Sequence, residues 1–285
     1  MPSFSAPMLQ QIQTTLWEAG EWARKMAREP FQVDQKGPED FVTAIDRTLD
    51  RQLAQQFQTW FPTDGIITEE NTQSIQAIRG EFPRLWLIDP LDGTEDFIHG
   101  RPDYAIMVGL LQDAQPIAGW IVRPESEHLI YGGPDWGLFT AQGTEPAQPL
   151  SPRQTADPQP DYCPILIGDR DQRQYGVAIQ QAIPEAQFYT LGSFGLKVLE
   201  VIQGRAGLYL YFNQRVKLWD TVAPLALAQQ AGLVCCDLEG LPLKFSLDAL
   251  DPVTLAHRQP IVIGWPPYVD RFLPALQSAL ACQVP

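Results

Sequence analysis

The chain is poor in cysteine, histidine and basic residues. Its 285 residues include four cysteines and three histidines, and 20 Lys and Arg stand against 34 Asp and Glu, a formal charge of −14. The cysteines form no C-x-x-C pair and no dense framework, which argues against a disulfide scaffold and predicts a reduced, cytoplasmic protein. The acidic balance should repel polyanions, so no nucleic-acid polymer is expected as a partner.

Long apolar runs are missing as well. Residues 1–7 contain neither the basic region nor the apolar region of a signal peptide, and no uninterrupted apolar run approaches the length of a membrane span. We therefore expect a soluble, unprocessed protein without a membrane partner. With 45% hydrophobic residues, the chain still has material for a substantial core.

The first half of the chain predicts two amphipathic helices followed by a mixed sheet. Apolar residues three and four apart predict helices over residues 7–28 and 43–61, and the stretch 31–40 between them is expected to be a loop. Turn residues then separate five short apolar runs, at 65–68, 85–88, 104–111, 117–122 and 128–131. This pattern is typical of an α+β half.

In the second half, predicted strands and helices alternate. The stretch 144–162 is rich in Pro, Gln and Asp and predicts a boundary or a long surface connection. Beyond it, strands are predicted over 164–168, 187–190, 207–212 and 260–264, and helices over 172–182, 195–203, 220–231 and 268–281. We therefore predict an α/β protein with an α+β domain over residues 1–150 and an α/β domain over residues 151–285.

One predicted strand ends in two carboxylates three residues apart, Asp89 and Asp92. A carboxylate that emerges from a buried strand needs a partner, and these two with the Leu91 carbonyl could share a Mg²⁺ ion. Gly93 and Thr94, which follow directly, could offer backbone N–H groups to a phosphate at the start of a helix. Taken alone, an Asp-Pro-x-Asp-Gly string is more often a surface turn.

Two further acidic sites strengthen the metal interpretation. Glu69 and Glu70 end the predicted strand at 65–68, and Asp220 opens an apolar helix. Singly, the Glu pair would be typical of a solvated loop and Asp220 of a helix N-cap. Three acidic sites, each at a strand end or a helix start, together indicate a metal-assisted phosphatase.

Four segments resemble, in the same order, the motifs of the inositol monophosphatase superfamily of Mg²⁺-dependent, lithium-sensitive phosphomonoesterases. Residues 89–97 resemble its D-P-[IL]-D-G-T-x-[DEN]-F signature, 42–46 its V-T-x-x-D element, 68–70 its G-E-E element and 219–232 its W-D…E-A-G-G element. The resemblance implies the layered αβαβα sandwich shared with fructose-1,6-bisphosphatases, with the site between the two halves.

The same resemblance implies two to three Mg²⁺ ions per site. The implied metal ligands are Glu69, Asp89, the Leu91 carbonyl, Asp92 and Asp220. The first three would hold one ion, Asp89, Asp92 and Asp220 a second, and a looser third would lie near Glu69. Thr94, backed by Glu69 and Asp46, would orient the attacking water.

In its second half the chain resembles the 3′(2′),5′-bisphosphate nucleotidases more than the inositol enzymes. Residues 192–197, 204–209 and 216–224 are similar to their G-x-x-G-x-K, G-x-A-x-x-Y and K-x-W-D-T-x-A-P run. The implied phosphate- and substrate-binding residues are Gly93, Thr94, Ser193, Lys197, Lys36 and Lys217. Lys197 would face the second phosphate of an adenosine bisphosphate, although a solvated lysine on a helix is an equal alternative. The expected reaction is hydrolysis of 3′-phosphoadenosine 5′-phosphate to AMP by a monomer or homodimer.

Other substrates stay open, whereas the sequence argues against two other classes of enzyme and against a non-catalytic protein. Thr68 replaces the usual glycine before the Glu pair, and Glu95–Asp96 replace the usual residues after D-G-T, which leaves inositol 1-phosphate or another sugar phosphate as possible substrates. A haloacid-dehalogenase phosphatase needs two carboxylates two residues apart, whereas Asp89 and Asp92 are three apart. A serine hydrolase is disfavoured as well, because the nucleophile elbow needs a glycine two residues before the serine, and Ser193 has none there. A non-catalytic binding member would be marked by a lost metal ligand, and all expected ligands are present.

Overall fold

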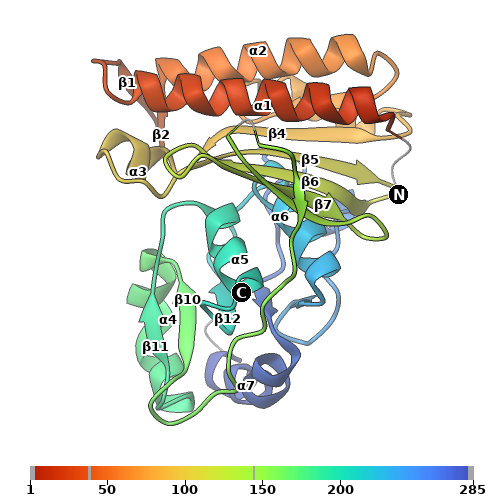
Figure 1. Cartoon of the computed structure of the whole chain (residues 1–285). Coiled ribbons are helices and arrows are strands. Elements are labelled where there is room, and N and C mark those ends of the chain that lie inside the picture. Colours follow the sequence, from red (N-terminus) through yellow and green to blue (C-terminus); the bar gives the residue numbers. More distant parts are fainter. Residues whose placement is uncertain (1–3, 38–39, 144, 282–285) are drawn as a thin grey trace. The chain divides into compact units, whose positions relative to one another are not determined.

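Seven strands form the larger sheet of the protein. The structure is a computed structural model that describes residues 4–37, 40–143 and 145–281 (Figure 1). The strands are β3 (Gly65–Thr68), β4 (Leu85–Asp92), β5 (Ala105–Gln112), β6 (Gln115–Arg123), β7 (His128–Gly133), β8 (Gly137–Gln142) and β9 (Gln148–Pro149), in that order across the sheet. Strands β3 and β4 are parallel, and all other neighbours are antiparallel. The five predicted strands are confirmed, and β8 and β9 are additional. The two residues of β9 are too few to show apolar alternation.

Helices α1 (Ala6–Met26) and α2 (Ala44–Trp60) lie over one face of this sheet (Figure 1). Both predicted helices are confirmed, and the buried positions of each recur at helical spacing. They pack on Trp86 and Trp120 of the sheet, and the ring of Phe61, just after α2, stacks on Trp86 at 4.6 Å. Burying a side chain of this size contributes roughly 2–3 kcal/mol, so this core stabilises both helices.

The expected loop at residues 31–40 is wrong in part. Strands β1 (Val33–Gly37) and β2 (Asp40–Thr43) form a two-stranded antiparallel ribbon there. The side chains of β1 are exposed or half-buried, so this strand needs no apolar alternation and carries no strand signal in the sequence. The ribbon leads directly into α2, where Thr43 and Asp46 form a capping box.

The other face of the sheet carries helix α6 (Leu218–Ala231), which rests on two paired glycines. Gly109 of β5 and Gly119 of β6 are in register. A Cβ atom on Gly119 would lie 2.2 Å from the Ala223 carbonyl oxygen, and one on Gly109 would lie 2.7 Å from the Ala223 nitrogen. Only glycine allows such a close approach of backbones. The start of α6, which carries Asp220, is therefore fixed on β5 and β6.

Contacts divide the chain into two compact units. Unit 1 comprises Met1–Leu150, Gly192–Leu196 and Trp219–Leu227, and unit 2 comprises Ser151–Leu191, Lys197–Leu218 and Ala228–Pro285. Two late segments thus pack with the first half of the chain, among them the one with Asp220, which we expected in the second domain. Domains cut at residue 150 stay a prediction.

Unit 2 is built around a five-stranded sheet. Its strands lie in the order β11 (Gln187–Tyr189), β10 (Pro164–Ile167), β12 (Leu208–Tyr211), β14 (Ile261–Gly264) and β13 (Val234–Cys236). The first three are mutually parallel, and β14 is antiparallel to both of its neighbours. Helices α4 (Asp169–Ala182) and α7 (Pro266–Leu280) pack on each other, and their apolar faces join the core of this sheet. The remaining helices are α3 (Thr94–Ile98), α5 (Phe194–Ile202), η1 (Ser74–Arg79) and η2 (Leu247–Ala249).

The structure also bears on the expected lack of a membrane span and on the state of the cysteines. Across residues 4–37, 40–143 and 145–281, no helix is long and apolar enough to cross a membrane. Cys163, Cys235 and Cys236 are free thiols, and Cys282 lies outside the described residues.

Candidate active site

Asp89 and Asp92 lie inside β4 rather than after its end, which corrects the predicted end at residue 88. The pairing with β5 shifts between them: Asp89 is opposite Met107 and Asp92 is opposite Ala105, three steps on one strand against two on the other. Residues three apart on a regular strand point to opposite faces, and the extra residue of a bulge cancels that alternation. The bulge therefore brings both carboxylates to one side of the strand.

Both carboxylates are held by backbone N–H groups. Asp89 is 1% exposed, and its Oδ1 accepts a hydrogen bond from Leu91 N at 2.9 Å. Asp92 Oδ2 accepts from Gly195 N at 2.9 Å and from the Ser193 hydroxyl. The predicted substrate residue Ser193 thus lies against a predicted metal ligand, and its hydroxyl also accepts from Leu196 N in the first turn of α5.

Three other carboxylates act electrostatically on the buried Asp89. Burial raises the pKa of Asp89 well above its usual value, and repulsion from Glu69, Asp92 and Asp220 raises it further. The Leu91 N–H bond opposes these effects and does not cancel them. The predicted acidic ligands, taken from three separate segments, therefore share one electrostatic environment in unit 1.

Thr94 joins this cluster to Asp46. The Thr94 hydroxyl lies 3.0 Å from the Leu91 carbonyl oxygen and 3.2 Å from Asp46 Oδ1, and it can donate to either. Asp46 is fully buried, and its Oδ2 accepts from the backbone N–H and the hydroxyl of Thr43. Burial raises the pKa of Asp46, which the Thr43 bonds only partly offset.

Gly93 connects β4 to α3 with a backbone that other residues rarely adopt. Its φ is +92°, and a Cβ there would lie 2.8 Å from the Asp103 carbonyl oxygen. Helix α3 has only five residues, so it offers less dipole to a phosphate than the sequence predicted. Asp96, in this helix, is buried and paired with Arg101.

Lys36 lies in β1 and contacts the Glu pair. Its Nζ is 2.9 Å from Glu69 Oε1 and 2.8 Å from Glu70 Oε1. Burial lowers the pKa of Lys36, but the two carboxylates outweigh this and raise it. Burial, followed by repulsion from Glu69, raises the pKa of Glu70 to about 7.

The other two predicted lysines belong to unit 2. Lys197 is buried, with its Nζ 5.6 Å from the centroid of the Tyr209 ring. Burial raises the pKa of Asp171, and the charge of Lys197 is one of the effects that oppose this shift. The alternative of a solvated lysine is therefore wrong. Lys217 is half-buried and pairs through its backbone with Ala256.

The acidic cluster fits a hard divalent cation in its chemistry. Within the described residues, no three Asp, Glu, His or Cys side chains converge closely enough to enclose an ion as they stand. Carboxylate oxygens of Asp89, Asp92 and Glu69 instead accept the hydrogen bonds named above. The donor set consists of oxygen atoms only, and its mutual repulsion would be relieved by a cation.

Asp50 is a buried residue near the site that the sequence analysis missed. It lies one helical turn after Asp46 in α2 and accepts hydrogen bonds from the Thr68 hydroxyl and from Glu70 N. The four-residue spacing of two aspartates on an otherwise apolar face is the signal that could have found it.

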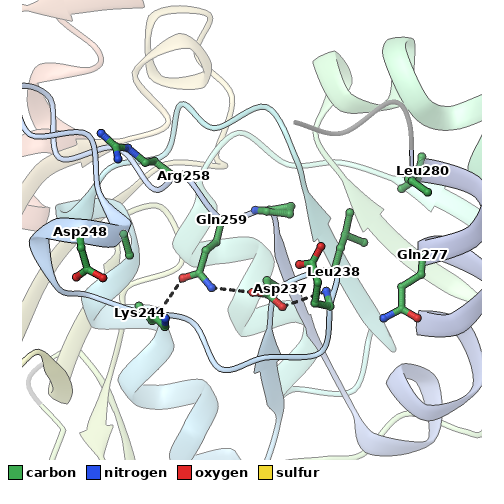
Figure 2. Close-up of a pocket in the computed structure, with 12 residues that line it drawn as sticks. Asp237, Leu238, Lys244, Asp248, Arg258, Gln259, Gln277 and Leu280 are labelled. Atoms are coloured by element: carbon green, nitrogen blue, oxygen red, sulfur yellow. Dashed lines mark hydrogen bonds between the residues drawn. The ribbon is translucent and has the colours of Figure 1, made fainter.

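A separate cavity of about 600 Å³ lies in unit 2 and is lined in part by Asp237, Lys244, Arg258 and Gln259 (Figure 2). None of the predicted site residues lines it. The cavity therefore adds nothing to the acidic cluster.

Comparison with known proteins identifies the family. The sequence matches the inositol monophosphatase family over residues 5–279. It is 26% identical to the 3′(2′),5′-bisphosphate nucleotidase CysQ of Aggregatibacter actinomycetemcomitans, over 86% of this chain and 90% of that protein. It is 28% identical to an inositol-1-monophosphatase of Rhizobium meliloti, over 74% of this chain and 77% of that protein.

Solved structures agree with this assignment at the level of the fold. An IMPase of Thermotoga maritima has a TM-score of 0.78 at 22% identity, covering 96% of this chain and 98% of its own. The extragenic suppressor protein suhB of Bartonella henselae has a TM-score of 0.75 at 23% identity, covering 96% and 99%. The predicted fold class is confirmed, and so is the predicted enzyme class, a metal-dependent phosphoric monoester hydrolase. The chain belongs to the inositol monophosphatase family.

Proposed function

We propose that this chain is a Mg²⁺-dependent 3′(2′),5′-bisphosphate nucleotidase that converts 3′-phosphoadenosine 5′-phosphate to AMP and phosphate. The observation that carries the chemistry is the bulge of β4, which brings the buried Asp89 and Asp92 to one side of the strand, where Glu69 and Asp220 also repel the charge of Asp89. The choice of substrate is supported by the relatives named CysQ, the first of which matches 86% of the chain, and by the motifs of the second half.

The proposed ligands of two to three Mg²⁺ ions are the carboxylates of Glu69, Asp89, Asp92 and Asp220 with the Leu91 carbonyl. Bound Mg²⁺ lowers the pKa of water and offsets the charge of the phosphate. The residues themselves preorganise the site, because the β4 bulge and the N–H groups of Leu91 and Gly195 fix Asp89 and Asp92 in advance.

Thr94 is proposed to orient the attacking water. Its hydroxyl proton has an acceptor on either side, Asp46 Oδ1 or the Leu91 carbonyl. The oxygen lone pairs are then available to accept a hydrogen bond from water, which fixes the direction of attack for in-line displacement. Asp46 acts through Thr94 in this scheme and need not exchange a proton.

The basic residues and the first turn of α3 are proposed to bind phosphate. Gly93 and Thr94 would donate backbone N–H groups to the phosphate that is cleaved. A cation on Glu69 would compete with Lys36 for that carboxylate and leave the ammonium group to the phosphate. Lys197 is proposed to face the second phosphate of the substrate, and Lys217 and Ser193 are further proposed phosphate- or substrate-binding residues.

The decisive experiment compares kcat/KM on 3′-phosphoadenosine 5′-phosphate and on inositol 1-phosphate, with and without lithium. We expect a preference for the bisphosphate and inhibition by lithium. A preference for the inositol ester of more than roughly tenfold, about 1.4 kcal/mol, would overturn the proposed substrate. The relative from Rhizobium meliloti, named an inositol-1-monophosphatase, makes that ester the second candidate.

A non-catalytic role is tested by the same assay. We expect Mg²⁺-dependent phosphate release that is lost in Glu69→Ala and in Asp89→Asn. Release that is unchanged in both variants would contradict the proposed metal ligands, and absence of release from the parent protein on every phosphate ester would favour a binding protein.

A further inference from the structure

The Glu69 backbone is held by partners on both sides. Its own N–H donates to the Ile88 carbonyl at 3.1 Å and extends the pairing of β3 with β4 by one residue. The residues immediately before and after it both bind the carboxylate of Asp50. Thr68 Oγ1 donates to Asp50 Oδ2 at 3.0 Å, and Glu70 N donates to Asp50 Oδ1 at 3.1 Å. The Asp50 carboxylate is therefore hydrogen-bonded to both sequence neighbours of Glu69.

Asp50 is placed for this role by α2. The helix packs against β3 and β4, and Asp50 is 3% exposed on the side that faces them. A buried carboxylate is costly unless its oxygens are hydrogen-bonded, and here each oxygen has a donor from the turn after β3. Burial raises the pKa of Asp50, and the bonds from Thr68 and Glu70 oppose that shift.

Thr68 is anchored at its backbone as well as its side chain. Its N–H donates to Ser74 Oγ at 3.0 Å, and that hydroxyl lies 2.6 Å from the Asn71 carbonyl oxygen. The turn that carries Glu69 is therefore closed on itself by Ser74 and tied to α2 by Asp50. A glycine at position 68 would have no hydroxyl to offer, so the bond to Asp50 depends on the threonine of this chain.

We propose that Asp50, acting through Thr68 and Glu70 N, is a positioning residue that aims the Glu69 carboxylate at the cluster around Asp89. It touches neither the cation nor the substrate. This inference rests on the proposed function, because it requires Glu69 to be a metal ligand. Groups that orient a metal ligand change metal affinity by roughly 10- to 100-fold when they are removed.

The test is calorimetric titration of the full chain with MgCl₂. Asp50→Ala and Thr68→Val should each raise the dissociation constant for Mg²⁺ by about tenfold or more. Thr68→Ser keeps the hydroxyl, and Asp50→Asn can accept from Glu70 N with its oxygen and donate to Thr68 Oγ1 with its amide. Both conservative variants should stay within about threefold of the parent protein.

Asp237→Ala is the matched control. Asp237 is also a buried carboxylate that accepts backbone bonds across a turn, from Glu239 N at 3.0 Å and Leu241 N at 2.8 Å, but it lies in unit 2 (Figure 2). Its removal should lower the melting temperature and leave the Mg²⁺ affinity unchanged. Thr68→Val has nearly the volume of threonine, so it serves as the test if Asp50→Ala does not fold.

If Thr68→Val and a folded Asp50→Ala both bind Mg²⁺ with the affinity of the parent protein, the positioning role of Asp50 is wrong. An equal loss of affinity in Asp237→Ala would also overturn it, because the effect would then be general destabilisation. Failure of the proposed function looks different: the parent protein itself would neither bind Mg²⁺ nor release phosphate.

Discussion

In unit 1, the buried carboxylate of Asp89 lies near three others, whereas in unit 2 the buried carboxylate of Asp237 is surrounded by donors. Asp89 accepts a hydrogen bond from Leu91 N, and burial together with repulsion from Glu69, Asp92 and Asp220 raises its pKa. Asp237 accepts from two backbone N–H groups and from the Gln259 side chain (Figure 2).

The two units differ in how the charge of a buried carboxylate is compensated. Buried polar groups that are fully hydrogen-bonded stabilise a fold, and buried like charges destabilise it unless another charge compensates. A set of carboxylates kept together at such a cost is typical of a functional site. The cavity of unit 2 that is lined in part by Asp237 shares no residue with the acidic cluster.

The largest effect on activity is expected when a buried aspartate of unit 1 is replaced by asparagine and the result is compared with the same replacement in unit 2. Asp89→Asn should lower kcat/KM by roughly a thousandfold, since it removes a proposed ligand of two ions. In EDTA the same variant should raise the free energy of unfolding by about 1 kcal/mol, because one of four repelling charges is gone. Phosphate release and urea unfolding measure the two effects.

Asp237→Asn is the matched control for that exchange. It should lower the free energy of unfolding by about 1–3 kcal/mol, since a buried donor loses its acceptor, with kcat/KM within about twofold of the parent. If Asp89→Asn were destabilising in EDTA and Asp237→Asn were not, the comparison between the units would be wrong.

Acid should act on the two units in opposite directions. Burial lowers the pKa of His257 in unit 2 from 6.5 to about 4. Folding therefore favours the neutral imidazole, and its contribution is present above pH 6.5 and is lost as the pH falls toward 4, about 3 kcal/mol in all. In unit 1 the pKa of Glu70 is raised to about 7, so protonation of Glu70 below pH 7 stabilises the metal-free unit.

Hydrogen exchange in EDTA, corrected for its intrinsic pH dependence, separates these effects. Between pH 7.5 and 5, protection should fall in β14 of unit 2 relative to β3 and β4 of unit 1. His257→Phe should remove the loss in unit 2, and His128→Gln, in unit 1, should not. Equal changes in both units of the parent protein would contradict the prediction.

A smaller effect is expected at the contact between α6 and the large sheet. Gly119→Ala would place a Cβ 2.2 Å from the Ala223 carbonyl oxygen, so α6 must shift, which costs about 1–3 kcal/mol. Because Asp220 lies one turn earlier in the same helix, kcat/KM should fall by roughly tenfold or more.

Gly168→Ala is the control in unit 2. No atom lies within 4 Å of a Cβ at this position, and the backbone conformation is ordinary. The free energy of unfolding should change by less than about 1 kcal/mol, with kcat/KM unchanged. A loss of activity in this variant equal to that of Gly119→Ala would remove the special role of the α6 contact.

The smallest effects concern residues in the left-handed backbone region. Asp113 and Ala114, with φ of 51° and 54°, form the two-residue turn between β5 and β6. Ala114→Gly should raise the free energy of unfolding by about 0.5–1 kcal/mol, because glycine has no steric penalty there. Leu255 of unit 2 has φ of 58° but is fully buried. Leu255→Gly should therefore be destabilising by about 2–4 kcal/mol, and thermal unfolding distinguishes the two outcomes.

Several elements could be located from local patterns of residues alone. The period of apolar residues predicted α1 and α2, and the apolar runs predicted the first five strands of the large sheet. Both patterns can be recognised because they depend only on residues close together in the sequence. The motif residues from Asp46 to Asp220 gave the family and with it the class of enzyme. Exposed or very short strands such as β1 and β9 left no such signal.

The way in which the site residues come together depends on tertiary contacts. Three features join segments up to 114 residues apart: the bulge that brings Asp89 and Asp92 to one side, the glycines that fix α6, and the hydrogen bonds of Asp50 on both sides of Glu69. Each depends on a close approach of two backbones or on a buried hydrogen bond, which local periodicity cannot encode. The burial of Lys197 against Tyr209 belongs to the same class, since a lysine on a helix looks the same in sequence whether it is solvated or buried.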